Sequence, residues 1–461
     1  MATFKTITPI NNSVYFEDTL NNKEDINKTL QKAKDAQKEW NNTPLKKRIG
    51  YIRQFIDEIV SKKDEISREI TLQMGRPISQ SGFEINGFKE RAEYLLDLAK
   101  ESLRPYYPKP IKGFERKIVK EPLGVVCLIS PWNYPFLTSV NVLIPALLAG
   151  NAVVLRHSLQ TPLVAKQYKE AFERAGLPEG IFSLLYLNHA DSAVLLEDKR
   201  VNGVFFTGSV GGGIAVQDAI KEKFIPCGLE LGGKDPAYVR VDADLDYSVA
   251  NLVDGSFFNS GQSCCGIERI YVDAKLYDEF VEKFVKLTKQ YKLGDPLLSE
   301  TNIGPMVKVG ASDFVRKQIS EAVQSGAKAL IDENLFPASK VGTPYLAPQV
   351  LVNVDHSMSV MNEESFGPVV GIMKVSSDEE AIKLMNDSKY GLTASLWTKD
   401  MNKAEELSKL IETGTVFMNR CDYLDPGLAW TGVKDTGRGI SLSTFGYDQV
   451  TRVKSIHFKE I

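Results

Sequence analysis

From residue 124 onward the sequence alternates short apolar runs with helical segments, and this rhythm restricts the fold more than any other feature. Apolar runs occupy residues 124–130, 151–156 and 203–209. A helical segment over 162–175 follows the second run, and a glycine-rich turn follows the third. Strands that alternate with helices form a parallel, doubly wound sheet, and such a sheet binds ligands at the carboxyl ends of its strands. We therefore expect an α/β fold with a ligand cleft at that edge.

A chain of 461 residues is too long for one hydrophobic core, so we expect more than one domain. A second α/β segment begins after residues 230–236, with helices predicted over 244–259 and 276–291. Further strands are expected around Ala329, Val350 and Val370. The sequence thus predicts two α/β lobes.

The first hundred residues read as helical. Apolar residues recur at helical spacing over 25–40 and 49–59, which is typical of amphipathic packing helices. Residues 103–122 differ, because they contain several prolines and end in an alternating pattern. A strand or an excursion from the domain is expected there rather than a helix.

Composition excludes several classes of protein. The net charge is −3 without a dense Lys/Arg cluster, so we expect no nucleic-acid partner. The longest apolar stretch, 140–155, is interrupted by Asn and Pro, and the first residues lack a secretory pattern, so we expect no membrane partner. Five cysteines, an odd number, favour a reducing compartment and a cytoplasmic enzyme. The four histidines show no metal-ligand spacing, so no metal site is expected and a metalloenzyme or thiol hydrolase is disfavoured.

Two residues with catalytic chemistry stand near predicted element ends. Cys264 follows a predicted helix and a Gly-Gln turn, where a partly exposed thiolate can act as a nucleophile. The alternative is that Cys264 and Cys265 are two small buried side chains. Glu230 ends a predicted strand in an apolar, glycine-rich context, where partial desolvation raises the pKa and suits a general base. The alternative for Glu230 is a capping or solvated group.

Two further segments offer hydrogen-bond donors. Asn133 lies just past a strand between Pro131 and Pro135, and its side-chain amide can donate to a developing oxyanion. Its alternative is an ordinary asparagine turn. The glycine-rich turn over 206–213 can bring backbone N–H groups to a pyrophosphate, although a tight strand–helix turn explains it equally.

Taken together, these motifs resemble those of the aldehyde dehydrogenase superfamily. The matching segments are Pro131-Trp132-Asn133, Phe206 to Ser209, Glu230 to Lys234, Gly261-Gln262-Ser263-Cys264, and Glu364 to Pro368. The resemblance extends over about 19–458. It implies an α/β aldehyde dehydrogenase-like fold, with a Rossmann-type cofactor domain, a second α/β catalytic domain and a small β oligomerisation extension.

The resemblance also implies domain limits. The NAD(P)-binding domain would comprise 1–102 and 123–231, and the catalytic domain 232–432. Residues 103–122 and 433–461 would form the oligomerisation or bridging segment. Relatives assemble through such an excursion and a terminal strand, here 452–458, so a homodimer or homotetramer is expected.

The implied activity is oxidation of an aldehyde to a carboxylic acid with NAD or NADP. Cys264, in the fourth place of Gly-Gln-x-Cys, would attack the aldehyde and form a hemithioacetal and then a thioester. The Asn133 amide and the Cys264 backbone N–H would hold the oxyanion, and Glu230 would activate the hydrolytic water. A CoA-acylating dehydrogenase is the nearest alternative, which Glu230 disfavours. A non-catalytic binding or structural member is a second alternative.

The resemblance assigns two further sets of residues. Ser209 would contact the pyrophosphate, Glu364 the nicotinamide ribose, and Phe366 would lie beside the ring. The whole cofactor set comprises Ile129, Trp132, Arg156, Ser158, Gly208, Ser209, Glu364 and Phe366. Lys234 would have a structural role. The substrate-lining set comprises Tyr134, Leu137, Phe258, Arg420 and Tyr423.

This chain departs from many relatives in three places. Arg156 to Leu159 replace a Lys-Pro-Ser-Glu segment, which removes an acid that would repel a 2′-phosphate. We therefore hypothesise that NADP⁺ is tolerated while NAD⁺ is slightly favoured. Gly437 to Ile440 lack the glutamate of a Gly-Arg-Glu segment, so a proton relay through that acid is absent.

The third departure is Arg420, in a stretch that lines the substrate mouth in relatives. It indicates a carboxylate-bearing substrate, or else a salt bridge with Asp422 or Asp425.

Overall fold

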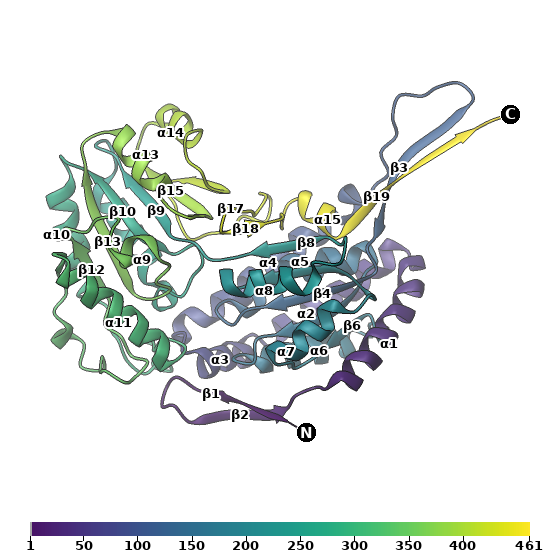
Figure 1. The fold of residues 1–461 in the computed structure, drawn as a ribbon, viewed down its shortest axis with the longest axis horizontal. Coiled ribbons are helices and arrows are strands. Elements are labelled where there is room, and N and C mark those ends of the chain that lie inside the picture. The colour runs from purple at the N-terminus through teal and green to yellow at the C-terminus, as the bar shows by residue number, and fades with distance from the viewer. Residues whose placement is uncertain (1) are drawn as a thin grey trace.

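The computed structural model describes residues 2–461 and has two α/β lobes, with a two-stranded arm that projects from them (Figure 1). The sheet of the first lobe has the order β18-β8-β7-β4-β5-β6. Its strands pair in parallel, except that β18 runs antiparallel to β8. The strands are β4 (Val125–Ser130), β5 (Ala152–His157), β6 (Phe182–Leu184), β7 (Val201–Thr207), β8 (Cys227–Glu230) and β18 (Gly437–Arg438).

Helices cover this sheet. Every residue of β4 is buried, because a parallel sheet has helices on both faces and its strands are apolar on both sides. The helix α5 is buried along nearly its whole length, and it packs against α4. The helices of the lobe are α1 (Lys23–Asn42), α2 (Leu45–Ser61), α3 (Lys63–Met74), α4 (Ile78–Ser102), α5 (Pro135–Ala149), α6 (Pro162–Arg174), α7 (His189–Glu197) and α8 (Val210–Ile220).

The second lobe holds a sheet with the order β11-β12-β13-β10-β9-β15-β16, parallel except at β11. Its strands are β9 (Asp235–Val239), β10 (Ile267–Asp273), β11 (Lys328–Ala329), β12 (Gln349–Val352), β13 (Val369–Val375), β15 (Thr393–Trp397) and β16 (Thr415–Met418). Its helices are α9 (Leu245–Phe257), η1 (Phe258–Gly261), α10 (Tyr277–Thr288), α11 (Val309–Gln324), η2 (Glu333–Leu335), α12 (Ser359–Asn362), α13 (Asp378–Asn386) and α14 (Met401–Ser408). A small ladder joins β14 (Tyr390–Gly391) to β17 (Val433–Lys434).

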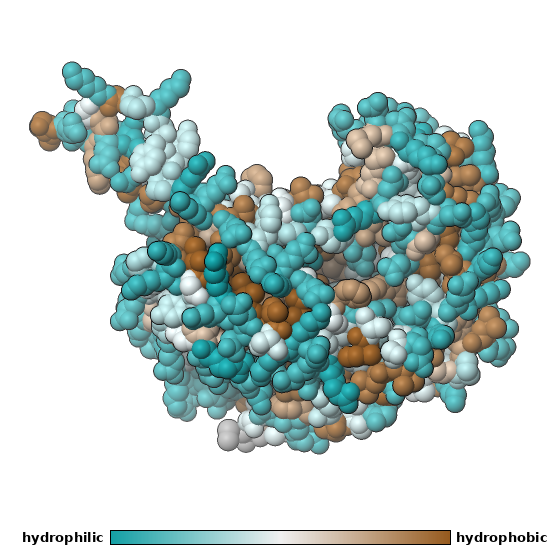
Figure 2. Space-filling model, turned by 180° about the vertical axis from the view of Figure 1, so that it is seen from behind, coloured by the Kyte–Doolittle hydropathy of each residue, from teal (hydrophilic) through white to brown (hydrophobic). Residues whose placement is uncertain are grey.

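The arm consists of β3 (Phe114–Pro122) and β19 (Thr451–Lys459), which follows the short helix α15 (Phe445–Gln449). The two strands are antiparallel over their full length. Figure 2 shows the arm standing clear of the body, and Val453 and Phe458 on it are exposed. Among the described residues, no helix is long and apolar enough to cross a bilayer.

The prediction that the first hundred residues are helical is wrong at their beginning. A hairpin of β1 (Thr3–Ile7) and β2 (Val14–Thr19) precedes α1. Phe4 and Thr6 are buried while their neighbours are exposed, which is the two-residue alternation of a strand. That alternation covers only five residues, which is too short to indicate a strand beside the long helical periodicity that follows it.

The core of the first lobe supplies a prediction about stability. The Phe55 ring on α2 is fully buried and stacks on Phe172, with 3.8 Å between ring centroids. We expect Phe55→Ala to destabilise the protein by about 3–5 kcal/mol, because it leaves a cavity in a packed core. The matched control is Phe224→Ala, at a fully exposed ring, which should change stability by less than about 0.5 kcal/mol. Urea denaturation measures both, and equal effects of the two variants would contradict this view of the core.

Candidate active site

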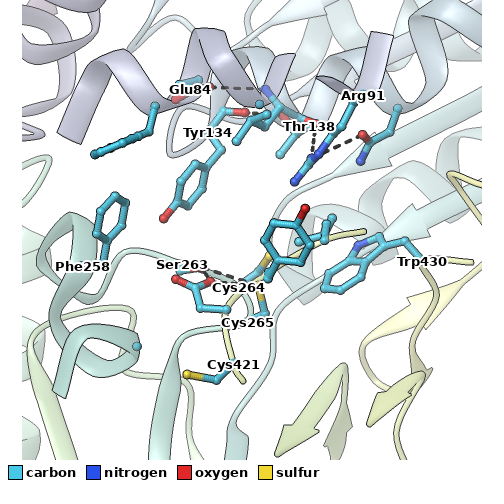
Figure 3. A pocket seen from close by; sticks show the side chains of 18 of the residues that line it. Glu84, Arg91, Tyr134, Thr138, Phe258, Ser263, Cys264, Cys265, Cys421 and Trp430 are labelled. Atoms are coloured by element: carbon cyan, nitrogen blue, oxygen red, sulfur yellow. Dashed lines mark hydrogen bonds between the residues drawn. The ribbon is translucent and has the colours of Figure 1, made fainter. Parts of the chain in front are cut away.

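A cavity of about 460 Å³ is lined by residues of both lobes (Figure 3). The first lobe contributes residues of α4, the start of α5, and the ends of β7 and β8. The second lobe contributes residues of α9 and the loop that carries Cys264, and residues 421–424 complete the wall. Cys264 and Glu230, which are far apart in sequence, both line this cavity.

The structure distinguishes the two neighbouring cysteines. Cys264 is partly exposed and faces the cavity, whereas Cys265 is only 2% exposed. The Cys265 thiol donates to Asp422 Oδ1 at 3.1 Å, and Ser263 Oγ donates to the same oxygen at 2.7 Å. The contact with Cys264, together with burial, raises the pKa of the Cys265 thiol well above its usual value. Both cysteines line the cavity, and Cys264 is the more exposed of the two.

The loop before Cys264 has a strained backbone. Asn259, Ser260 and Gly261 have φ values of +52°, +57° and +71°. A Cβ atom on Gly261 would lie 2.3 Å from the carbonyl oxygen of Gly367, so this position requires glycine. Strain of this kind persists only where the surrounding structure holds it. The backbone of the Cys264 loop therefore packs closely against the backbone at Gly367.

Asn133 is hydrogen-bonded to that loop. Its side chain is 5% exposed, and Nδ2 donates to the backbone oxygen of Gln262 at 3.2 Å. Its own carbonyl oxygen accepts hydrogen bonds from Arg76 Nη2 and, at 3.4 Å, from Asn259 Nδ2. These contacts fix the Asn133 amide two residues from Cys264.

A buried ion pair that the sequence analysis did not identify organises this region. Arg76 Nη1 pairs with Glu84 Oε2, and both side chains are almost completely buried. Glu84 Oε1 accepts from the N–H groups of Phe136 at 2.7 Å and Leu137 at 3.3 Å, so it caps α5, which has no cap from its own N-cap residue. Arg76 Nε donates to Asn259 Oδ1 at 3.1 Å. The pair therefore joins α4, the start of α5 and the Cys264 loop.

Glu230 lies at the end of β8, on the cavity wall. Its carboxylate accepts from Ser441 Oγ at 2.5 Å and from Thr207 Oγ1 at 3.1 Å. Burial raises the pKa of Glu230, and these two hydrogen bonds oppose the increase because they favour the ionised form. The carboxyl group is thus shifted toward the neutral range, where a general base is effective.

A second buried ion pair holds the segment around Glu364. Lys234 Nζ pairs with Glu268, whose carboxylate accepts from the backbone N–H groups of Ser365 at 2.8 Å and Phe366 at 2.9 Å. Glu364 Oε1 accepts from the N–H of Gly233 at 3.0 Å, and burial raises the pKa of Glu364 to about 8. Lys234, for which a structural role was predicted, is thus connected through Glu268 to the backbone of Ser365 and Phe366.

The cofactor residues predicted from the resemblance lie outside the 460 Å³ cavity. Ser209 caps α8, since its Oγ accepts from Gly212 N at 3.2 Å. A Cβ atom on Gly208 or Gly212 would come within 2.6 Å of the Phe206 ring. Glycine at these positions lets the strand, the turn and the helix N-terminus pack closely, as a pyrophosphate site requires.

The remaining donors also fit a dinucleotide. Arg156, at the carboxyl end of β5, donates from Nη2 to the carbonyl oxygen of Leu187 at 3.1 Å. Its Nε is buried and has no hydrogen-bond partner among residues 2–461. Trp132 and Phe366 meet edge to face, with 5.7 Å between ring centroids. Ser158 Oγ accepts from Gln160 N, and Ile129 is buried in β4. The N-terminus of α8 and the Arg156 guanidinium are positive, and the Glu364 carboxylate can accept hydrogen bonds, a combination that suits NAD or NADP.

Four of the five predicted substrate-lining residues line the cavity: Tyr134, Leu137, Phe258 and Tyr423. Arg420 does not. It is exposed, and its guanidinium carbon lies 3.3 Å from the centroid of the Tyr423 ring. In the described chain it makes no ion pair with Asp422 or Asp425. The cavity contains Arg91 instead, which the sequence analysis missed.

Comparison with known proteins establishes the family. Residues 1–456 match the aldehyde dehydrogenase family. The chain is 33% identical to an aldehyde dehydrogenase of Paenarthrobacter nicotinovorans, over 94% of each chain. It is 31% identical to a succinate semialdehyde dehydrogenase [NAD(P)+] of Escherichia coli, over 94% of this chain and 93% of the other. A betaine aldehyde dehydrogenase of Staphylococcus aureus, solved in complex with NAD⁺, matches with a TM-score of 0.94 at 30% identity, over 99% of this chain and 92% of that one.

The chain therefore belongs to the aldehyde dehydrogenase family, and the expected fold class is confirmed. It is an enzyme that oxidises aldehydes with NAD or NADP as the cofactor.

Proposed function

We propose that the enzyme oxidises an aldehyde to the free carboxylic acid by covalent catalysis on Cys264. The observation that carries this proposal is that Cys264 and Glu230 line one cavity while Asn133 is hydrogen-bonded to the Cys264 loop. A nucleophile, an amide donor and a carboxylate base thus meet at one place, which is the set that thioester formation and hydrolysis need.

The first step is attack of the Cys264 thiolate on the aldehyde carbon. The new carbon–sulfur bond turns the carbonyl oxygen into an oxyanion, which the Asn133 amide and the backbone N–H of Cys264 hold. That N–H donates to no other residue in the part of the chain that the structure describes, so it is available. Asn133 Nδ2 carries two N–H bonds, of which its bond to Gln262 uses one.

The first lobe would hold most of the cofactor, from β4 to the start of α8, and Glu364 and Phe366 of the second lobe would contact its nicotinamide end. When bound, NAD⁺ or NADP⁺ accepts the hydride that leaves the substrate carbon. We assign Glu364 to the nicotinamide ribose and Ser209 to the pyrophosphate, and the cation of Arg156 at the carboxyl end of β5 supports tolerance of a 2′-phosphate. We propose that NAD⁺ is slightly favoured over NADP⁺.

The last step is hydrolysis of the acyl–Cys264 thioester. Glu230 removes a proton from a water molecule, the resulting hydroxide adds to the acyl carbon, and the thiolate leaves. The position of Glu230 on the cavity wall supports water, rather than CoA, as the acyl acceptor.

The proposed division of labour follows the predicted domains. Residues 1–102 and 123–231 bind the cofactor, and 232–432 provide Cys264. Residues 103–122 and 433–461 include both strands of the arm, whose exposed Val453 and Phe458 support assembly into a homodimer or homotetramer. Among the described residues all five cysteines are free, which supports action in a reducing compartment such as the cytoplasm.

An aldehyde panel with NAD⁺ and with NADP⁺ tests the proposal. We expect aldehyde-dependent NADH formation and release of free acid without CoA. NADP⁺ should be used with a lower kcat/KM than NAD⁺. Cys264→Ala should lose about 10⁴-fold or more of the kcat, because covalent catalysis is abolished. Cys265→Ala is the matched control and should keep most of the activity. Unchanged turnover in Cys264→Ala, or a strict need for CoA, would contradict the mechanism.

The raised pKa of Glu230 predicts where the deacylation rate falls on the acid side of its pH profile. Glu230 acts as a base only when it is ionised, so deacylation slows as pH falls through its pKa, which lies above the usual value for glutamate. Ser441→Ala removes a hydrogen bond that favours the ionised form and should move this limb to still higher pH. Single-turnover kinetics across pH measure the limb. The assignment is wrong if Glu230→Gln retains the same limb and rate.

A further inference from the structure

Two arginines line the cavity, and only one has a counter-ion. Arg76 is paired with Glu84. Arg91 lies on α4, seven residues after Glu84. Its Nη1 donates to the backbone oxygen of Leu137 at 2.9 Å and to Asn141 Oδ1 at 3.4 Å. Both acceptors are neutral. No residue of the described chain forms a salt bridge with Arg91, although the carboxylates of Glu230, Glu84 and Asp422 interact with its charge at longer range.

The Arg91 guanidinium faces the cavity. The residue is 8% exposed, and its Nε and Nη2 make no hydrogen bond within the described chain, yet neither atom is closed off from solvent. Figure 3 shows the side chain extending from α4 into the space above Cys264 and Trp430. The open donors are thus directed into the same cavity as the reactive thiol.

A buried cation without a counter-ion is unfavourable. Burial lowers the pKa of Arg91, but a guanidinium stays charged in a protein. The free energy of desolvation is recovered only when an anion pairs with the charge. A carboxylate is the best fit, because its two oxygens match two donors of one guanidinium.

The acids around the cavity do not supply that anion. Glu84 is bound to Arg76, Asp422 accepts from Ser263 and Cys265, and Glu230 accepts from Thr207 and Ser441. Glu90 and Asp254 also line the cavity, but both are exposed to solvent. None of these carboxylates hydrogen-bonds to Arg91, so a carboxylate in direct contact with its open donors would come from a bound molecule.

We propose that Arg91 binds the carboxylate of the substrate, so that the enzyme prefers aldehydes with a carboxylate at the other end of a short chain. This inference rests on the proposed function and names its substrate class. Recognition of a substrate carboxylate is thus assigned to Arg91, which lines the cavity, and not to Arg420, which does not. The names of relatives do not decide the class, because a semialdehyde carboxylate and betaine aldehyde carry opposite charges.

The experiment compares three aldehydes of equal chain length: 4-oxobutanoate, butanal and 4-aminobutanal. In the unmodified enzyme kcat/KM should be highest for 4-oxobutanoate. Arg91→Gln should lower kcat/KM for 4-oxobutanoate by about 10- to 100-fold, mainly through KM, because a charged hydrogen-bonded contact is lost. Butanal should change by less than about threefold. Arg91→Lys should restore part of the preference, since it keeps the charge without the paired donors.

Controls separate this proposal from its rivals. Arg420→Gln should leave the substrate preference unchanged, because Arg420 lies outside the cavity. An equal loss for all three aldehydes in Arg91→Gln would instead assign Arg91 to the support of Cys264 or Glu230, and would overturn the proposal. A preference of the unmodified enzyme for 4-aminobutanal would also overturn it. Absence of activity with every aldehyde would refute the proposed function itself, and circular dichroism of the variant would show whether it folds.

Discussion

The buried ion pair between Arg76 and Glu84 is the contact on which the rest of the site depends. Glu84 caps the start of α5, and Arg76 holds both the carbonyl oxygen of Asn133 and the side chain of Asn259. One pair therefore sets the position of the amide donor and of the strained turn before Cys264. Breaking a buried pair by removing one partner costs about 3–5 kcal/mol. A change at either residue would move the Cys264 loop and the Asn133 amide together.

The alternation of apolar runs and helical segments in the sequence predicts most of the fold. Each apolar run over 124–130, 151–156 and 203–209 contains or overlaps a strand, because a parallel sheet buries both faces and leaves a continuous apolar signal. The hairpin at 3–19 is not predicted, since its strands are short, one face of β1 is buried and no residue of β2 is buried. The sequence does not predict the pairing of β18 with β8, because a strand of two residues is too short to show an alternation of apolar and polar residues.

The sequence points to the candidate catalytic residues better than to their surroundings. Motifs indicated Cys264 and Glu230, and the structure brings them to one cavity. Glu84 and Arg91 are not among the predicted site residues, because the first hundred residues read only as helical. A signal was present: both lie on the same stripe as Phe88, at spacings of four and three residues, so their charges fall on the buried face. Whether a buried charge is paired depends on residues far away in the chain, and helical periodicity does not encode those contacts.

In the proposed mechanism Cys264 carries the acyl group and Glu230 releases it. Intact-protein mass spectrometry of Glu230→Gln, mixed with NAD⁺ and an aldehyde, tests this most directly. The account predicts a protein heavier by one acyl group, with the added mass on the peptide of Cys264 and absent in the Cys264→Ala, Glu230→Gln double variant. Stoichiometric NADH without any covalent adduct, or an adduct on Cys265, would contradict the account.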